Sequence, residues 1–87
     1  MPRVYIPSML RKFSDGLSEV DVEGKRIDEV IENLESRFPG IRNCLCTGDQ
    51  IRLELNVSVD NKISSLGMVQ PVKNQSEIHF IPAIGGG

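Results

Sequence analysis

The chain has 87 residues, enough for one domain with a single modest core. Hydrophobic residues make up 39% of it and charged residues 25%, which is typical of a soluble globular protein and excludes a disordered one. The net charge of −2 argues against a nucleic-acid partner. No segment approaches the ~20 apolar residues of a membrane span, and the N-terminus lacks a secretory signal, so we expect a cytoplasmic protein without a membrane partner.

The first part of the chain predicts a β-hairpin. Val4 and Ile6 flank a tyrosine, and Val20 and Val22 alternate with acidic residues, so both segments have the period of a half-buried strand. A polar, glycine-containing stretch separates them and supplies the connecting loop.

Two short basic pairs, Arg11-Lys12 and Lys25-Arg26, lie in this region. Each is too small to create an extended positive field around the protein. We interpret both as solvated surface, with electrostatic steering of a partner as the alternative.

The period changes to that of a helix from residue 27 onward. The apolar residues that share one helical face are Ile27, Val30, Ile31, Leu34 and Phe38. Asp28 and Glu29 in the first turn complement the helix dipole, and Pro39-Gly40 ends the helix.

The second half of the chain predicts two further strands. Apolar and polar residues alternate strictly from Ile51 to Val59, and a shorter strand is predicted over 77–81. In that last strand Ile78 and Phe80 share one side, which places His79 on the opposite side.

The predicted order is strand, strand, helix, strand, strand. One amphipathic helix on one face of a small mixed sheet is an α+β roll, and this order in a chain of this length suggests the β-grasp. We expect a single domain over 1–87, in which 82–87 form a flexible C-terminal tail.

Few residues fit a catalytic or metal site. His79 is the only histidine, and an exposed strand position is the simpler interpretation of it. Cys44 and Cys46 with one distant histidine fall short of four metal ligands, so we interpret them as reduced, partly buried thiols. No glycine-rich loop precedes a helix, which excludes a phosphate-binding loop. We therefore expect no bound cofactor, no metal and no enzymatic activity of the chain itself.

The C-terminal tail is the remaining candidate for a functional site. An apolar strand is followed by Pro82-Ala83-Ile84 and then by Gly85, Gly86 and Gly87. Glycine is costly to order and adds little to a core, so this run does not serve the fold. A narrow arm can enter a tight active site, where ATP would convert the Gly87 carboxylate into an acyl-adenylate that sulfur or an amine can attack. In this hypothesis the protein is itself the substrate.

The exposed side of the last strand leads directly into this arm. His79 and Ile81 are therefore predicted to contact a partner. Pro82 and Ile84 are predicted to anchor the tail and contact the partner, with simple strand-end packing as the alternative. Gly85 and Gly86 are predicted to lie in the partner's active site.

Four segments together resemble one known family. The opening VYIPSMLRKF, the helix RIDEVIENLESRFPGI, the strand LNVSVDN and the ending IHFIPAIGGG are similar to the MoaD/ThiS family of ubiquitin-like sulfur carriers. Within it, the IPSMLR opening and the PAIGGG ending are most similar to the MoaD-like and CysO-like group. The family's terminal diglycine corresponds to Gly86 and Gly87.

The chain departs from the family pattern at two turns. The family's common Asn-Gly after the LNVSV strand is Asp60-Asn61 here, and its common Gly-Asp before the last strand is Gln75-Ser76. These departures concern loop geometry more than the tail.

The resemblance implies a specific chemistry. A ubiquitin-activating-like adenylyltransferase and sulfurtransferase would use ATP to adenylate the Gly87 carboxylate and convert it to a thiocarboxylate. A sulfur-acceptor enzyme would then take the sulfur, either a cysteine synthase or the large subunit of molybdopterin synthase. The alternatives are a ubiquitin-like modifier joined to lysines and a plain β-grasp binding module.

Overall fold

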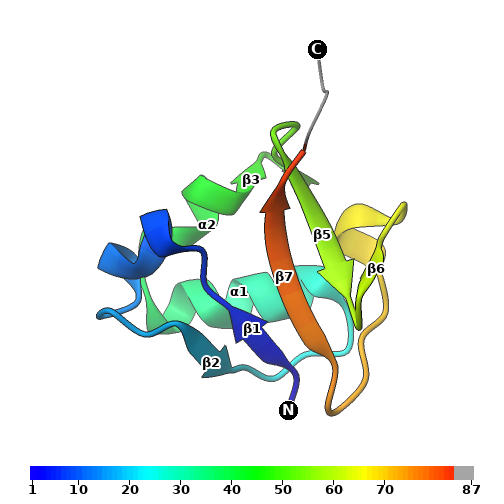
Figure 1. Ribbon diagram of the computed structural model, residues 1–87, viewed down its shortest axis with the longest axis horizontal. Coiled ribbons are helices and arrows are strands. Elements are labelled where there is room, and N and C mark those ends of the chain that lie inside the picture. Colours follow the sequence, from blue (N-terminus) through cyan, green and yellow to red (C-terminus); the bar gives the residue numbers. More distant parts are fainter. Residues whose placement is uncertain (84–87) are drawn as a thin grey trace.

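A mixed sheet with helix α1 against one face organises the protein (Figure 1). The computed structural model describes residues 1–83. The sheet has five strands in the order β2-β1-β7-β5-β6, with β1 and β7 parallel and every other neighbouring pair antiparallel. The elements are β1 (Arg3–Tyr5), the 3-10 helix η1 (Ser8–Phe13), β2 (Glu19–Asp21), α1 (Ile27–Arg37), α2 (Ile41–Leu45), β3 (Cys46–Thr47), β4 (Gln50–Ile51), β5 (Leu55–Val59), β6 (Lys62–Ile63), the 3-10 helix η2 (Gly67–Val69) and β7 (Glu77–Pro82).

The predicted N-terminal hairpin is confirmed. Strands β1 and β2 pair antiparallel, with Val4 opposite Val20, and Val4 also lies opposite Ile78 of β7. All three side chains are buried in the core. The alternation of apolar and polar residues that predicts the strands therefore also selects the face that packs on the helix.

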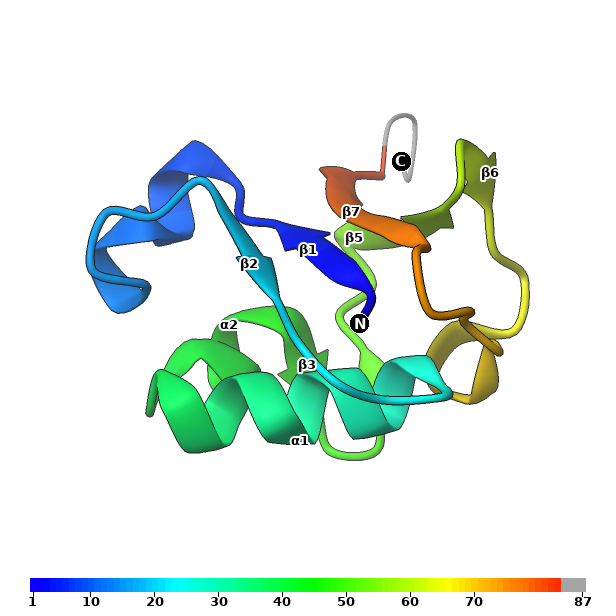
Figure 2. The same ribbon diagram turned by 90° about the horizontal axis from the view of Figure 1, so that it is seen from below.

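Helix α1 packs against one side of the sheet with its predicted apolar stripe (Figure 2). Ile27, Val30, Ile31 and Leu34 are fully buried, and Phe38, which follows the helix, is buried as well. The helical period of the sequence is thus confirmed as the period of core packing.

The predicted nine-residue strand from Ile51 to Val59 is wrong in its first half. Ile51 belongs to the small β3–β4 hairpin, where it lies opposite Cys46, and only residues 55–59 join the main sheet. Between them the chain turns, because the Leu55 amide donates to the Arg52 carbonyl at 3.0 Å. Leu53, which the strict alternation over 51–59 would place on the same side as Val57 and Val59, is instead 92% exposed.

Helix α2 and the β3–β4 hairpin that follows it are absent from the predicted order. Gly40 starts α2 with φ +102°, a left-handed conformation that favours glycine. Ile41 and Leu45 then bury their side chains in the same core as α1. The connection between β5 and β7 also contains structure that is absent from the predicted order, namely β6 and η2.

Gly24 lies where the chain leaves β2 for α1, and we predict that Gly24→Ala destabilises the fold. A Cβ there would lie 2.7 Å from Cγ2 and 2.8 Å from the backbone nitrogen of Val30, at φ +150°. We expect a loss of about 2–4 kcal/mol in the free energy of unfolding, measured by urea denaturation.

Gly16→Ala is the matched control. Gly16 also has a positive φ, of +81°, but a Cβ there has no heavy atom within 4 Å. Its cost should be that of the backbone conformation alone, about 1–2 kcal/mol. Equal losses for the two variants would refute the steric explanation at Gly24.

Candidate functional site

The face of the sheet away from α1, here called the outer face, carries the alternate residues of β7. Ile78 and Phe80 are buried on the side of the sheet that faces α1. Glu77, His79 and Ile81 are exposed or half-buried on the outer face. The predicted orientation of His79 is therefore confirmed. Since β7 ends at Pro82, its outer residues lie directly before the predicted tail.

His79 lies against an aromatic ring. It lies opposite Tyr5 in the parallel β1–β7 pair, and the two rings stack with centroids 4.3 Å apart and planes 4° from parallel. On the other side of β7, His79 lies opposite Ser58 of β5. The imidazole is surrounded by strand residues, and the two stacked rings present a flat surface on the outer face. The sequence pattern alone did not identify the contact of Tyr5 with His79, because it depends on the register of the parallel pair.

Charged side chains lie at the opposite end of the outer face. Arg3 of β1 donates from Nε to Asp21 of β2 at 2.9 Å and lies 3.5 Å from the Glu19 carboxylate. The hydrogen bond from Arg3 lowers the pKa of the Asp21 carboxyl below its usual range. These side chains are about half exposed, so their pairing contributes little stability. The outer face is thus charged near the start of β7 and aromatic and aliphatic near its end.

The last described residues are held by the segment that precedes β5. Pro82 lies opposite Leu55, and the Ala83 amide donates to the Glu54 carbonyl at 2.8 Å. β7 thus extends into the first residue of the predicted tail. Ile84, Gly85, Gly86 and Gly87 lie outside the described residues.

The Arg52–Glu54 segment is itself fixed to α2. The Arg52 amide donates to the Leu45 carbonyl at 3.0 Å, and its Nε donates to the Asn43 carbonyl at 2.8 Å. Through these bonds, the position of α2 determines the position of the segment that accepts the hydrogen bond from Ala83. Sequence reasoning missed this support because α2 is too short to show a helical period.

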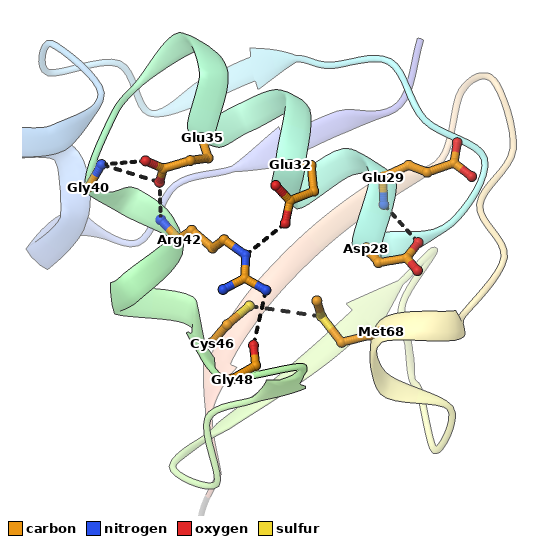
Figure 3. Close-up of polar contacts among 9 residues, drawn as sticks. All are labelled: Asp28, Glu29, Glu32, Glu35, Gly40, Arg42, Cys46, Gly48 and Met68. Atoms are coloured by element: carbon orange, nitrogen blue, oxygen red, sulfur yellow. Dashed lines mark hydrogen bonds and ion pairs between the residues drawn. The ribbon is translucent and has the colours of Figure 1, made fainter.

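A carboxylate from α1 fixes the start of α2 (Figure 3). Glu35 accepts hydrogen bonds from the backbone amides of Gly40 at 2.9 Å and Arg42 at 2.8 Å. These two bonds hold the pKa of the Glu35 carboxyl below its usual range. They also satisfy amides that a helix N-terminus leaves without partners inside the helix.

Arg42 extends the same contact toward the β3–β4 turn. Its Nε donates to Glu32 at 2.8 Å and its terminal nitrogen donates to the Gly48 carbonyl at 3.0 Å (Figure 3). Nearby, the Cys46 sulfur lies 3.9 Å from that of Met68. Burial raises the pKa of the Cys46 thiol, which makes it a packing residue rather than a nucleophile.

The described part of the chain offers no metal centre and no membrane-spanning helix. Among residues 1–83, no three histidine, cysteine, aspartate or glutamate side chains group closely enough to hold a metal ion. Within the same residues, the helices are too short and too polar to cross a bilayer. The site that the geometry favours is the outer face of β7 and the chain that follows it.

Comparisons with known proteins identify the family and the fold of the chain. Residues 4–87 match the model of the ThiS family. A chain from the crystal structure of the Amycolatopsis orientalis BexX/CysO complex superposes with a TM-score of 0.91 and 30% identity, with both chains covered completely. Mycobacterium tuberculosis CysO gives a TM-score of 0.88 at 24% identity, over 97% of this chain and 100% of its own.

A more distant match has the same fold. The small archaeal modifier protein 1 from Methanosarcina acetivorans gives a TM-score of 0.78 at 20% identity, over 99% of this chain and 95% of its own. A search of curated proteins gives no match. The predicted α+β β-grasp fold and the predicted resemblance are confirmed.

We predict that Glu35→Gln destabilises the protein at neutral pH and that this effect fades in acid. The folded pKa of Glu35 is lowered from 4.5, so the stability it contributes is present above that value and is lost as the pH falls through the folded pKa. Urea unfolding of the wild type and the variant between pH 7 and pH 3 measures the difference. Glu23→Gln, which alters an exposed carboxylate, is the control. A difference independent of pH would refute the role of the charged form.

Proposed function

The chain belongs to the ThiS family, and we propose that it is a sulfur carrier whose Gly87 carboxylate is adenylated and then converted to a thiocarboxylate. The observation that supports the proposal most directly is the match to the family, which extends through Gly87. The geometry adds that β7, the central strand of the sheet, carries the outer face and leads into the diglycine segment.

The proposed reaction has two steps. A carboxylate oxygen of Gly87 attacks the α-phosphorus of ATP, which forms an acyl-adenylate and releases pyrophosphate. Hydrosulfide from the sulfur donor then attacks the acyl carbon and displaces AMP, and loss of its proton leaves a thiocarboxylate on the chain. ATP is bound and used by the partner, so this chain acts as a co-substrate and holds no cofactor.

Two kinds of partner follow from this scheme. The first is a ubiquitin-activating-like adenylyltransferase and sulfurtransferase. The second is the enzyme that accepts the sulfur, a cysteine synthase or the large subunit of a molybdopterin synthase. The Amycolatopsis orientalis relative was crystallised in a complex with BexX, which supports the view that carriers of this kind form complexes with other proteins.

We predict that incubation with ATP, a sulfide source and the host's activating enzyme replaces one oxygen of the Gly87 carboxylate by sulfur. Mass spectrometry of the intact protein and of its C-terminal peptide measures the change. Peptide localisation is required because oxidation of one of the three methionines gives nearly the same mass difference. A variant lacking Gly86 and Gly87 is the control and should remain unmodified.

Three other outcomes distinguish the alternatives. Covalent ladders on other proteins that vanish in the truncated variant would favour a lysine-conjugated modifier. An unmodified Gly87 with an active partner enzyme would contradict the carrier and leave the modifier or the plain binding module. Native residues beyond Gly87, seen in the mass of the endogenous protein, would mean that processing must precede either chemistry.

We further predict that Ile81→Ala weakens binding to the activating enzyme, because it removes an aliphatic side chain from the outer face beside the proposed tail. The Michaelis constant for the carrier in ATP–pyrophosphate exchange should rise several-fold, at an unchanged melting temperature. Val69→Ala shortens an exposed aliphatic side chain of η2 and is the control. Equal Michaelis constants for the wild type and Ile81→Ala would exclude Ile81 from the interface.

A further inference from the structure

A crevice of about 310 Å³ lies between β7 and the point where the chain turns from β1 into η1. Its walls include the stacked rings of Tyr5 and His79, together with Pro7, Arg11 and Ser18. Phe80 of β7 also lines it. The strand that leads into the proposed tail is therefore one wall of the crevice.

Arg11 is the cationic group of this crevice. Its Nε donates to the Ile6 carbonyl at 3.2 Å, which fixes the guanidinium at the end of β1. A guanidinium has five N–H donors, so this bond leaves most of them available. Among residues 1–83, no carboxylate lies within ion-pair distance of Arg11.

Four other arginines of the protein pair with carboxylates, whereas Arg37, like Arg11, has no ion pair among residues 1–83 and donates to a backbone carbonyl, that of Asp21, at 3.4 Å. Those with a carboxylate partner within the chain are Arg3, Arg26, Arg42 and Arg52. Arg11 is half-buried, is held in place by a backbone carbonyl and faces a crevice beside the outer face. This arrangement fits an anion supplied from outside the chain.

We propose that this crevice binds an aspartate or glutamate side chain of the activating enzyme. The planar guanidinium matches a carboxylate with two parallel hydrogen bonds, and the flat Tyr5–His79 stack leaves room for a side chain beside it. A protein that takes the tail must approach β7, whose His79 and Phe80 line the crevice. The inference rests on the proposed function and adds the charge that the partner must present.

The main test compares two single changes that remove the same charge. Arg11→Gln removes the guanidinium, whereas Lys12→Gln removes the neighbouring exposed cation of η1, whose amine lies over the Phe13 ring. Long-range attraction to the partner weakens equally in both variants. We expect Arg11→Gln to raise the Michaelis constant for the carrier in ATP–pyrophosphate exchange about tenfold, and Lys12→Gln less than about twofold.

A second variant blocks the crevice without disturbing the bond between Arg11 and Ile6. Ser18→Glu places a carboxylate at the crevice wall, where it competes for the guanidinium and repels the partner's carboxylate. We expect it to raise the Michaelis constant as Arg11→Gln does. Ser65→Glu, at an exposed position that does not line the crevice, is the control. Melting temperatures of all variants separate loss of docking from loss of fold.

The possible outcomes distinguish failure of the proposed function from failure of the docking proposal. If wild-type chain gives no exchange with an active partner enzyme, the proposed function fails, and this inference fails with it. If wild-type chain is adenylated and both Arg11→Gln and Ser18→Glu keep its Michaelis constant, the crevice is not a docking site. Equal effects of Arg11→Gln and Lys12→Gln would show general electrostatic attraction and would also overturn the proposal.

Discussion

The parallel pairing of β1 and β7 is the constraint on which the rest of the structure depends. It brings Val4 opposite Ile78, and both side chains are buried in the core. It also brings Tyr5 opposite His79 on the outer face. Parallel neighbours cannot be joined by a tight turn, so the chain between them must cross the sheet. That crossing contains α1, which covers one face of the sheet and leaves the outer face uncovered (Figure 2). One register therefore fixes the core, the aromatic stack and the direction in which the chain continues.

Much of this architecture follows from periodicity in the sequence, and the failures have a physical cause. The stripe of α1 repeats over three turns, so its buried face could be predicted. The alternation from Ile51 to Val59 is equally compatible with one strand or with two strands separated by a turn. The contact of Arg52 with α2 and the pairing of Ile51 with Cys46 select the second arrangement. A long-range contact of this kind leaves no local pattern, and the support of Ala83 by Glu54 could not be predicted for the same reason.

The two turns at which the chain departs from the family pattern are in contact with each other. The Asp60 carboxylate accepts hydrogen bonds from the Ser76 hydroxyl at 3.0 Å and from the Glu77 amide at 2.9 Å. Asp60 and Asn61 both have positive φ, the geometry of a tight hairpin turn that aspartate and asparagine tolerate. Sequence comparison presents them as two separate changes, whereas the structure shows a single polar contact that ties the β5–β6 turn to the start of β7.

The central place of β7 has a mechanical consequence. A pull on the chain beyond Ala83 acts along the axis of β7, which is hydrogen-bonded to β1 on one side and to β5 on the other. Such a load shears all the bonds of both ladders at once, whereas a strand at the edge of a sheet would be peeled off one bond at a time. An enzyme that grips the end of the chain can thus strain it or release it without unravelling the domain behind it.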